Sequence, residues 1–355
     1  KPACWIEERT LKSSKIPVYY VCWNIVEALN VEINGLEYVF GVGGLHASVE
    51  NKIFESDDDY EIIDCDVSSM YPNLAIVNEL YPEHLGKLFC TIYKDMYLQR
   101  KSYDKKSAEN AMLKLALNGT YGDSNNEFSP FYDPKFTMSI TVGGQLSLCM
   151  LVEQFLKVEG LTVIQCNTDG ITVKIPRSKR NEYDEICKQW QATTKLELEY
   201  AFYRKMCVRD VNNYIAVYTD GKVKMKGAYE YADLGWHKNH SSLVIPKDAE
   251  AALVRGEDIE WFIHNHKDKM DFMLRVKVPR SNKLISIDEF GVEQQEQNIC
   301  RYYVSNNGVE LMKIMPALEG SKTFRLVRDP ITLEDIICKT EAEVKRYLKK
   351  GFFDK

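Results

Sequence analysis

The sequence predicts an α+β fold. One observation is a pair of β-prone runs, residues 162–164 and 171–173, separated by residues 167–170 (NTDG). An Asp-Gly pair between two such runs is typical of a tight antiparallel hairpin. A second observation is helical spacing of apolar residues over 87–100 (Leu88, Ile92 and Met96) and 107–118 (Ala108, Met112 and Leu115), with a short polar basic connection between them. This pattern predicts a helical hairpin.

Composition restricts the class of protein. The 355 residues are 45% hydrophobic and 28% charged, which excludes disordered and fibrous chains and suggests roughly two or three domains. No apolar run approaches the roughly 20 residues of a membrane-spanning helix, and residues 1–12 are too charged for a signal sequence. We therefore expect a soluble cytoplasmic chain with no membrane partner. Because Lys1 is not a methionine, we also expect processing or a longer parent protein.

Net charge and cysteine spacing bear on the partners of the protein and on the redox state of its thiols. The net charge of −6 gives no general attraction to nucleic acid, so such a partner must be met by local basic patches. The ten cysteines contain no CxxC pair, which favours reduced thiols over a disulfide scaffold.

The N-terminal part is predicted to be rich in strands. Residues 18–29 and 31–42 are apolar stretches that lead into Gly43-Gly44. The acidic run 55–61 is expected to be a solvated loop, and it leads into residues 62–67, which have the pattern of a short buried strand.

A third amphipathic helix is predicted over residues 145–158, ended by Gly160 and followed by a strand over 161–166. The remaining predicted elements are strands over 213–218, 222–225 and 301–304 and helices over 247–254 and 340–350.

Two carboxylates stand out by their placement. Asp66 ends an apolar strand, and Asp169 lies at the tip of the predicted hairpin. Carboxylates gathered at one end of a sheet repel one another unless a cation lies between them, and Mg²⁺ takes oxygen ligands and substrate phosphates. The alternative is that Asp-Gly serves only the turn. Asp64 shares a strand face with Asp66 and is either a supporting carboxylate or the rim of the site.

A cation, an amide and a phenol share one face of the second predicted helix. Lys114, Asn118 and Tyr121 follow i, i+4, i+7 spacing, so a phosphate and a flat base could lie there. The alternative is a solvated helix face with Gly122 as its cap. The preceding connection is basic and could grip a polyphosphate together with Lys114; its residues are Arg100, Lys101, Lys105 and Lys106.

Three segments, in this order, resemble the polymerase motifs of family B DNA polymerases. Residues 66–73 (DVSSMYPN) are similar to motif A, DxxSLYPS. Residues 114–122 (KLALNGTYG) are similar to motif B, KxxxNSxYG, and residues 167–170 (NTDG) to motif C, DTDS. Their joint order is more specific than any one of them.

Three shorter matches extend the resemblance over about residues 40–230. Residues 212–214 (NNY) occupy the place of the family's KxY segment, and Lys226-Gly227 resembles the KG that closes the next strand. Upstream, residues 43–46 (GGLH) resemble the glycine pair before motif A.

The resemblance implies a right-hand polymerase with an antiparallel-sheet palm, short helical fingers and a mixed α/β thumb. Asp66 and Asn118 are only 52 positions apart, which implies minimal fingers and an ordinary nucleic-acid primer. A 3′–5′ exonuclease domain is expected upstream of this chain, if one exists. The implied domains are 1–82 (N-terminal segment and first part of the palm), 83–122 (fingers), 123–230 (palm) and 231–355 (thumb).

The implied activity is template-directed DNA synthesis with primer-template DNA, dNTPs and possible replication accessory proteins as partners. Asp66, Asp169 and the backbone carbonyl of Val67 would hold two Mg²⁺ ions, with Mn²⁺ as a possible substitute. Tyr71 would exclude a 2′-hydroxyl. The resemblance assigns nucleotide binding to Ser69, Met70, Tyr71, Arg100, Lys105, Lys114 and Asn118. It assigns template or primer binding to Tyr121, Gly122, Thr168, Tyr214, Lys226 and Gly227.

The chain also departs from the family pattern. Asn167 and Gly170 replace the first aspartate and the serine of motif C, Gly119 replaces the motif B serine, and Asn212 and Asn213 replace basic residues. These departures leave open a polymerase-fold protein that binds primer-template DNA with weak or lost catalysis. A third alternative is an unrelated cytosolic α+β protein whose motifs match by chance. Short fingers and the NTDG form of motif C suggest a phage or phage-derived enzyme.

Two histidine pairs have ligand-like spacing, His237 with His240 and His264 with His266. Neither comes with cysteines or acids at zinc spacing, so we expect surface histidines.

Overall fold

The computed structural model describes residues 7–10, 17–20, 29–41, 43–232, 234, 238–315, 325–328, 335–338 and 353–354. The chain divides into two compact units, Lys1–Leu234 with Val244–His266, and Gly235–Leu243 with Lys267–Lys355. Residues 244–266, which lie within the predicted thumb of residues 231–355, cluster with the first unit.

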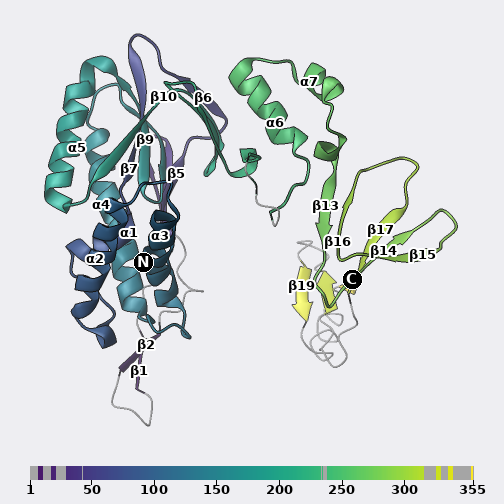
Figure 1. The fold of residues 1–355 in the computed structure, drawn as a ribbon, viewed down its shortest axis with the longest axis horizontal. Coiled ribbons are helices and arrows are strands. Elements are labelled where there is room, and N and C mark those ends of the chain that lie inside the picture. The colour runs from purple at the N-terminus through teal and green to yellow at the C-terminus, as the bar shows by residue number, and fades with distance from the viewer. Residues whose placement is uncertain are drawn as a thin grey trace. The chain divides into compact units, whose positions relative to one another are not determined.

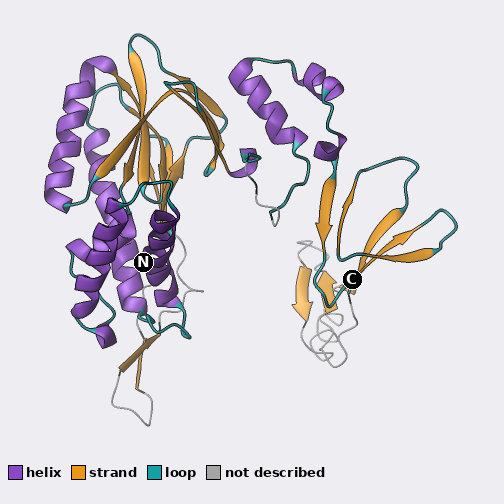
Figure 2. Cartoon of the chain, in the orientation of Figure 1, coloured by secondary structure: helices purple, strands orange, loops and turns teal. Residues whose placement is uncertain are grey.

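A large antiparallel sheet forms the centre of the first unit (Figure 2). Its strand order is β12-β11-β10-β7-β9-β8-β5-β4-β3, and β6 pairs with the second half of the long strand β10. The strands are β3 Leu29–Ile33, β4 Leu36–Gly41, β5 Gly44–Ser48, β6 Lys52–Glu55, β7 Tyr60–Val67, β8 Thr162–Asn167, β9 Gly170–Pro176, β10 Leu198–Asp210, β11 Asn213–Tyr218 and β12 Val223–Lys226. A separate pair, β1 Glu7–Thr10 and β2 Pro17–Tyr20, is also antiparallel.

Helices that precede residue 195 pack against the sheet or against one another, whereas the two later helices contact each other, and the first of these contacts the turn at Gly227–Tyr229 (Figure 1). They are α1 Met70–Val77, α2 Leu88–Ser102, α3 Ala108–Gly122, α4 Pro134–Phe155, α5 Arg180–Thr194, α6 Val244–Glu250 and α7 Ile259–Asn265. Short 3₁₀ turns lie at Glu83–Leu85, Asp123–Asn125, Arg177–Lys179 and Gly227–Tyr229, and a π-turn lies at Ala251–Arg255. The α+β class and the helical hairpin α2–α3 are confirmed.

The two faces of the sheet differ because side chains alternate along each strand. Ile63 and Cys65 of β7 belong to the large core that α4 and α5 complete. Ile62 belongs to a second, smaller cluster that includes Tyr203 and Tyr214. Asp64 and Asp66 share the parity of Ile62, so the sheet presents both carboxylates on the face opposite to the helix-covered core.

The buried faces of the helical hairpin differ from the prediction. Leu88 and Ile92 of α2 are 67% and 53% exposed, whereas Tyr93 and Tyr97 are buried. In α3, Leu115 is 74% exposed. Aromatic rings provide the packing surface here, and the hydroxyl of Tyr93 donates to the carbonyl of Leu117. Leu88 and Ile92 instead line an apolar cavity of about 600 Å³ between α2 and α3.

Helix α4 begins eleven residues before the predicted start at residue 145. Asp133 is its N-cap, accepting from the amide of Phe136, and Pro134 follows at the first helical position. This helix is long and apolar enough to cross a membrane, contrary to the sequence expectation, but half of its most apolar window is buried inside the protein. Packing against α1, α5, β5 and β9 accounts for that apolar character.

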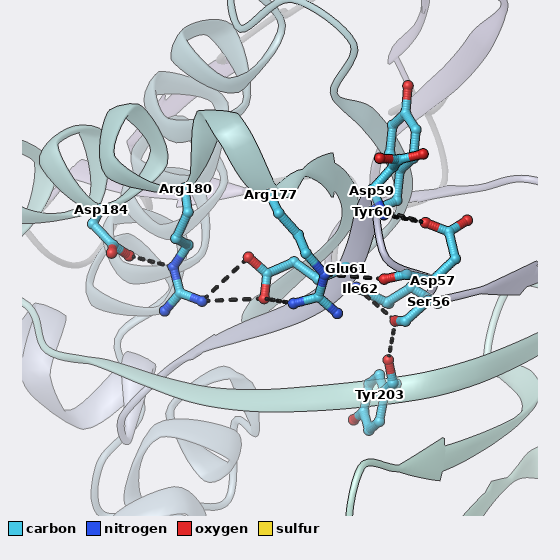
Figure 3. Close-up of polar contacts among 10 residues, drawn as sticks. All are labelled: Ser56, Asp57, Asp59, Tyr60, Glu61, Ile62, Arg177, Arg180, Asp184 and Tyr203. Atoms are coloured by element: carbon cyan, nitrogen blue, oxygen red, sulfur yellow. Dashed lines mark hydrogen bonds and ion pairs between the residues drawn. The ribbon is translucent and has the colours of Figure 1, made fainter.

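The acidic run 55–61 is only partly a solvated loop (Figure 3). The carboxylate of Asp57 accepts from the amides of Asp59 and Tyr60, which fixes the turn before β7. Glu61 is largely buried, and its carboxylate pairs with Arg177 and Arg180 at 3.6 and 3.3 Å. These ion pairs attach the start of α5 to the start of β7.

Within its described residues, the second unit contains three small antiparallel sheets, β13-β16, β15-β14-β17 and β19-β18-β20. Their strands are β13 Leu274–Lys277, β14 Lys283–Ile287, β15 Glu293–Glu296, β16 Ile299–Tyr302, β17 Glu310–Ile314, β18 Arg325–Arg328, β19 Asp335–Cys338 and β20 Phe353–Asp354, with a 3₁₀ turn at Lys269–Phe272. The predicted helix 340–350 and residues 21–28 lie outside the described residues.

Candidate active site

The two predicted metal ligands come from neighbouring strands. Asp66, near the end of β7, pairs in register with Gly170, the first residue of β9. Asp169 precedes Gly170 in the β8–β9 turn, and its carbonyl accepts from the amide of Val67 at 2.7 Å. Both aspartates are exposed. The sheet therefore brings Asp66, Val67 and Asp169 together, as the sequence predicts.

Gly170 leaves room for the side chain of Asp66. A Cβ built on Gly170 would overlap Oδ1 of Asp66 and would lie 3.3 Å from the carbonyl oxygen of Cys65. The glycine that departs from the family serine thus lies directly beneath the Asp66 carboxylate.

The β8–β9 turn has an unusual backbone. The amide of Asp169 donates to the carbonyl of Asn167 at 2.6 Å, a three-residue γ-turn centred on Thr168. Thr168 has φ of +60°, a conformation that β-branched residues rarely adopt. Such backbone conformations concentrate at functional sites.

Both aspartates hold protons more tightly than ordinary carboxyls. Burial of its surroundings and the neighbouring Asp64 raise the pKa of Asp66 to about 7. Desolvation also raises the pKa of Asp169, with a further contribution from Asp64, while Lys114 and Lys224 act in the opposite direction. For both aspartates removal from water is the largest cause of the raised pKa, and the neighbouring carboxylate of Asp64 adds to it.

This donor set fits a hard divalent cation. Carboxylate and carbonyl oxygens are the ligands that Mg²⁺ takes, and Mg²⁺ usually keeps several waters and substrate phosphates. Within the described part of the chain, no group of three or more His, Cys, Asp or Glu side chains gathers around one point. Asp66, Asp169 and the backbone carbonyl of Val67 are the oxygen donors that the sequence predicts for this site.

The carboxylate of Asp64 is hydrogen-bonded to other side chains of the protein. Its carboxylate accepts from the hydroxyl of Thr172 at 2.6 Å, the hydroxyl of Tyr203 at 2.7 Å and the ammonium of Lys224 at 3.3 Å. Asp64 is only 5% exposed, and the Lys224 ammonium also contacts the Tyr203 hydroxyl at 3.0 Å. Two roles were left open for Asp64, a supporting carboxylate and the rim of the site. Its contacts favour the rim, because the carboxylate oxygens are already hydrogen-bonded within the protein.

The segment similar to motif A continues into α1, where its side chains contact other parts of the protein. Ser69 is the N-cap of α1 with φ of +46°, and its hydroxyl accepts from Arg100 at 2.6 Å. Tyr71 donates to the carbonyl of Gly43 at 2.9 Å and stacks on Tyr121, with ring centroids 4.4 Å apart. Met70 is buried beside Gly144 of α4. The structure thus joins residues of motifs A and B.

Ion pairs connect the α2–α3 hairpin to β10 and the residue before it. Lys105 pairs with Glu199 at 3.0 Å, and Lys101 pairs with Glu197 at 2.6 Å. Glu199 is the register partner of Asp66. The acidic side chains had no sequence signal, because their placement depends on the pairing of β7 with β10.

Lys114 and Asn118 are exposed on α3, as the predicted face requires. Gly122 is the last residue of α3 and has φ of −61°, so it does not form a left-handed cap. The positive charge of Lys114 lowers the pKa of the Asp169 carboxyl, which partly offsets the raising effect of desolvation.

The KxY-like segment lies farther along the same face. Tyr214 is only 3% exposed, and the ammonium of Lys224 lies over its ring at 5.8 Å. Lys226 pairs in register with Tyr214 and lies 3.9 Å from Glu230. Gly227 has φ of +63°, and a Cβ there would overlap the carbonyl of Asn212. Sequence reasoning missed Lys224, although its position two residues before Lys226 places both on one strand face.

Among the described residues, His240, His264 and His266 belong to no group of three or more side chains that could hold a metal ion. His264 is exposed and lies 3.9 Å from Glu260, and His266 contacts the ring of Phe262. His237 lies outside the described residues.

Comparison with known proteins relates part of this chain to archaeal DNA polymerases. No family model matches the chain. It is 34% identical over 119 residues to DNA polymerase 1 of Saccharolobus solfataricus, which is 32% of this chain and 13% of that protein. It is 24% identical over 180 residues to DNA polymerase 1 of Sulfurisphaera ohwakuensis, covering 50% and 20% of the two chains. It is 31% identical over 131 residues to DNA polymerase 1 of Sulfolobus acidocaldarius, covering 36% and 14%.

The chain thus matches a fifth or less of the length of each of these relatives. Among solved structures, the family B DNA polymerase of Pyrobaculum calidifontis aligns with a TM-score of 0.46 and 14% identity, over 91% of this chain and 46% of that chain.

Proposed function

We propose that this chain is the core of a DNA-directed DNA polymerase that adds deoxynucleotides to a primer 3′ end by two-metal nucleotidyl transfer. The observation that carries the proposal is the pairing of Asp66 with Gly170, which brings Asp66 and Asp169 together on the open face of the sheet. The partial similarity to archaeal DNA polymerases supports the same conclusion.

Asp66, Asp169 and the carbonyl of Val67 would hold two Mg²⁺ ions, and Mn²⁺ would serve as a substitute. When bound, the ions activate the primer hydroxyl and neutralise charge on the phosphates. The raised pKa values of both aspartates are consistent with a site that takes up cations.

The remaining groups would bind and orient the substrates. Arg100, Lys105 and Lys114 would contact the triphosphate, and Lys105 would leave Glu199 to do so. The stacked rings of Tyr71 and Tyr121 offer a flat surface beside Asp169 for the sugar and the nascent base pair. Ser69, Met70 and Asn118 are assigned to the nucleotide, and Gly122, Thr168, Tyr214, Lys226 and Gly227 to the template and primer.

In this proposal the large sheet is the palm, α2–α3 the fingers and the chain from 231 onward the thumb. Accessory proteins, a cytoplasmic location and a phage or phage-derived origin stay predictions; the similar proteins named above are archaeal.

Extension of a labelled DNA primer on a template tests the proposal. We expect Mg²⁺-dependent extension with dNTPs and none with ribonucleotides. Asp169→Asn, which keeps the side-chain volume, should abolish extension. Asp220→Asn, at an exposed aspartate in the β11–β12 turn, is the matched control and should leave it intact.

A chain that retains primer-template binding in a mobility-shift assay but fails to extend the primer under any of these conditions would favour the alternative, a DNA-binding protein with lost catalysis. Equal activity of the parent and Asp169→Asn would contradict the assignment of the site.

A further inference from the structure

The turn that carries Asp169 depends on an uncommon conformation of one residue. Thr168 is the centre of the γ-turn and has φ of +60°. A β-branched side chain in this region persists only when the surrounding structure holds it. Because Thr168 immediately precedes Asp169, its backbone conformation determines the position of Asp169 relative to Asp66.

Strand β5 supplies backbone contacts that hold Thr168. The carbonyl of Leu45 accepts from the Thr168 amide at 2.9 Å. Gly44 has φ of +147°, and a Cβ there would lie 3.2 Å from Cγ2 and 3.3 Å from Cα of Thr168. Because Gly44 carries no side chain, β5 can approach the turn closely.

His46 adds the side-chain contact. Its Nε2 lies 3.1 Å from Oγ1 of Thr168, and His46 pairs in register with Asn167. The Thr168 hydroxyl also lies 3.4 Å from Oδ1 of Asn167. A hydroxyl has one proton, so when Thr168 donates to Asn167 it accepts from a protonated Nε2 of His46.

We infer that His46 is a positioning residue for Asp169. It acts through the Thr168 hydroxyl, which together with the Leu45 carbonyl holds the turn in its left-handed conformation. Asn167 extends the same chain of polar contacts, which gives this departure from the family motif a role in the turn. The kinetic part of the inference rests on the proposed polymerase function; the conformational part does not.

Kinetics separate positioning from a general structural role. His46→Ala should lower kcat roughly tenfold, the order of one lost hydrogen bond, with the KM for dNTP unchanged. His46→Gln, which can return an N–H donor, should restore most of kcat. In a Thr168→Val background His46→Ala should add no further loss. His84→Ala removes a histidine in hydrogen-bond contact with the carbonyl of Pro130, outside the site, and is the matched control.

Amide hydrogen exchange tests the turn without any activity. Exchange at residues 168–170 should be roughly tenfold faster in His46→Ala and in Thr168→Val, but unchanged in His84→Ala. Thr168→Val removes the same contact from the other side if His46→Ala fails to fold.

Two results would overturn the inference: unchanged exchange at the turn, or an equal loss of kcat from His46→Ala in both backgrounds. If the parent chain proves inactive, the polymerase proposal fails while the exchange experiment still decides the role of His46.

Discussion

The side chain of Asp66 lies over the backbone of Gly170, its register partner on the neighbouring strand. Any side chain at position 170 would overlap the Asp66 carboxylate in its observed position. The glycine in this chain's version of motif C is therefore coupled to the carboxylate of motif A, and the coupling can be measured.

Gly170→Ala should destabilise the parent by about 1–2 kcal/mol, because the new methyl group displaces Asp66 in a packed position. In an Asp66→Ala background the same change should cost clearly less, because only the 3.3 Å contact with the carbonyl oxygen of Cys65 then remains. Denaturant unfolding of the four proteins gives the interaction energy. Equal effects of Gly170→Ala in both backgrounds would contradict the coupling.

Stability of the metal-free protein should depend on pH through Asp66. Because its pKa is raised to about 7, the folded protein binds this proton more tightly than the unfolded chain does. The Asp66 contribution therefore lowers folding stability as pH rises from about 4 to about 7. Asp66→Asn should raise the urea midpoint relative to the parent at pH 8 and change it less at pH 5, both in chelator.

Asp220→Asn provides a control of opposite sign. The pKa of Asp220 is lowered by Lys222, so the folded state favours its ionised form. Its removal should cost stability at pH 8 rather than add it. A gain at pH 8 in both variants would point to net charge instead of the local environment of Asp66.

Lys224→Met should destabilise the protein by about 2–3 kcal/mol by leaving the buried carboxylate of Asp64 without its cation. The value is below that of a fully buried pair because the Lys224 side chain keeps 23% of its exposure. Adding Asp64→Asn should recover much of the loss. Lys222→Met, at a lysine whose side chain is 79% exposed, should change the unfolding midpoint little.

Glu199→Gln should lower the KM for dNTP by a few-fold, because Lys105 would no longer have to leave an ion pair to reach the triphosphate. Exposed ion pairs contribute about 0–1 kcal/mol, which limits the effect to that size. Glu197→Gln breaks the neighbouring pair with Lys101 and should leave the KM unchanged. Steady-state kinetics at low salt, where screening is weakest, measure both.

Local pattern predicted the strand that carries Asp66, the hairpin that carries Asp169 and the helical hairpin between them. It failed for features that long-range packing determines, such as which face of a helix is buried. Tyr93 and Tyr97 form the buried face of α2, although hydropathy favours Leu88 and Ile92. The start of α4 at Pro134 was missed despite the Asp-Pro signal at residues 133–134.

Only those residues of the candidate site that lie within one of the short motifs could be predicted from the sequence. Asp66, Tyr71, Asp169 and Tyr121 were found from short segments. Lys224 and Glu199 were not, because each acquires its neighbour through strand pairing, which no local pattern encodes. His46 was noticed only as the end of a glycine-containing segment, and its contact with Thr168 spans 122 positions.

The sheet also determines when the site can form. Strand β7 is flanked by β9 and β10, which come much later in the chain, and the Tyr203–Asp64 hydrogen bond joins residues 139 positions apart. Closing such long loops gives a high contact order, which slows folding. During synthesis, β7 must wait for β9 and β10 to emerge, so the apolar residues of an early strand stay unpaired for most of the translation of this unit. We expect this interval to be the period in which the chain is most prone to aggregation.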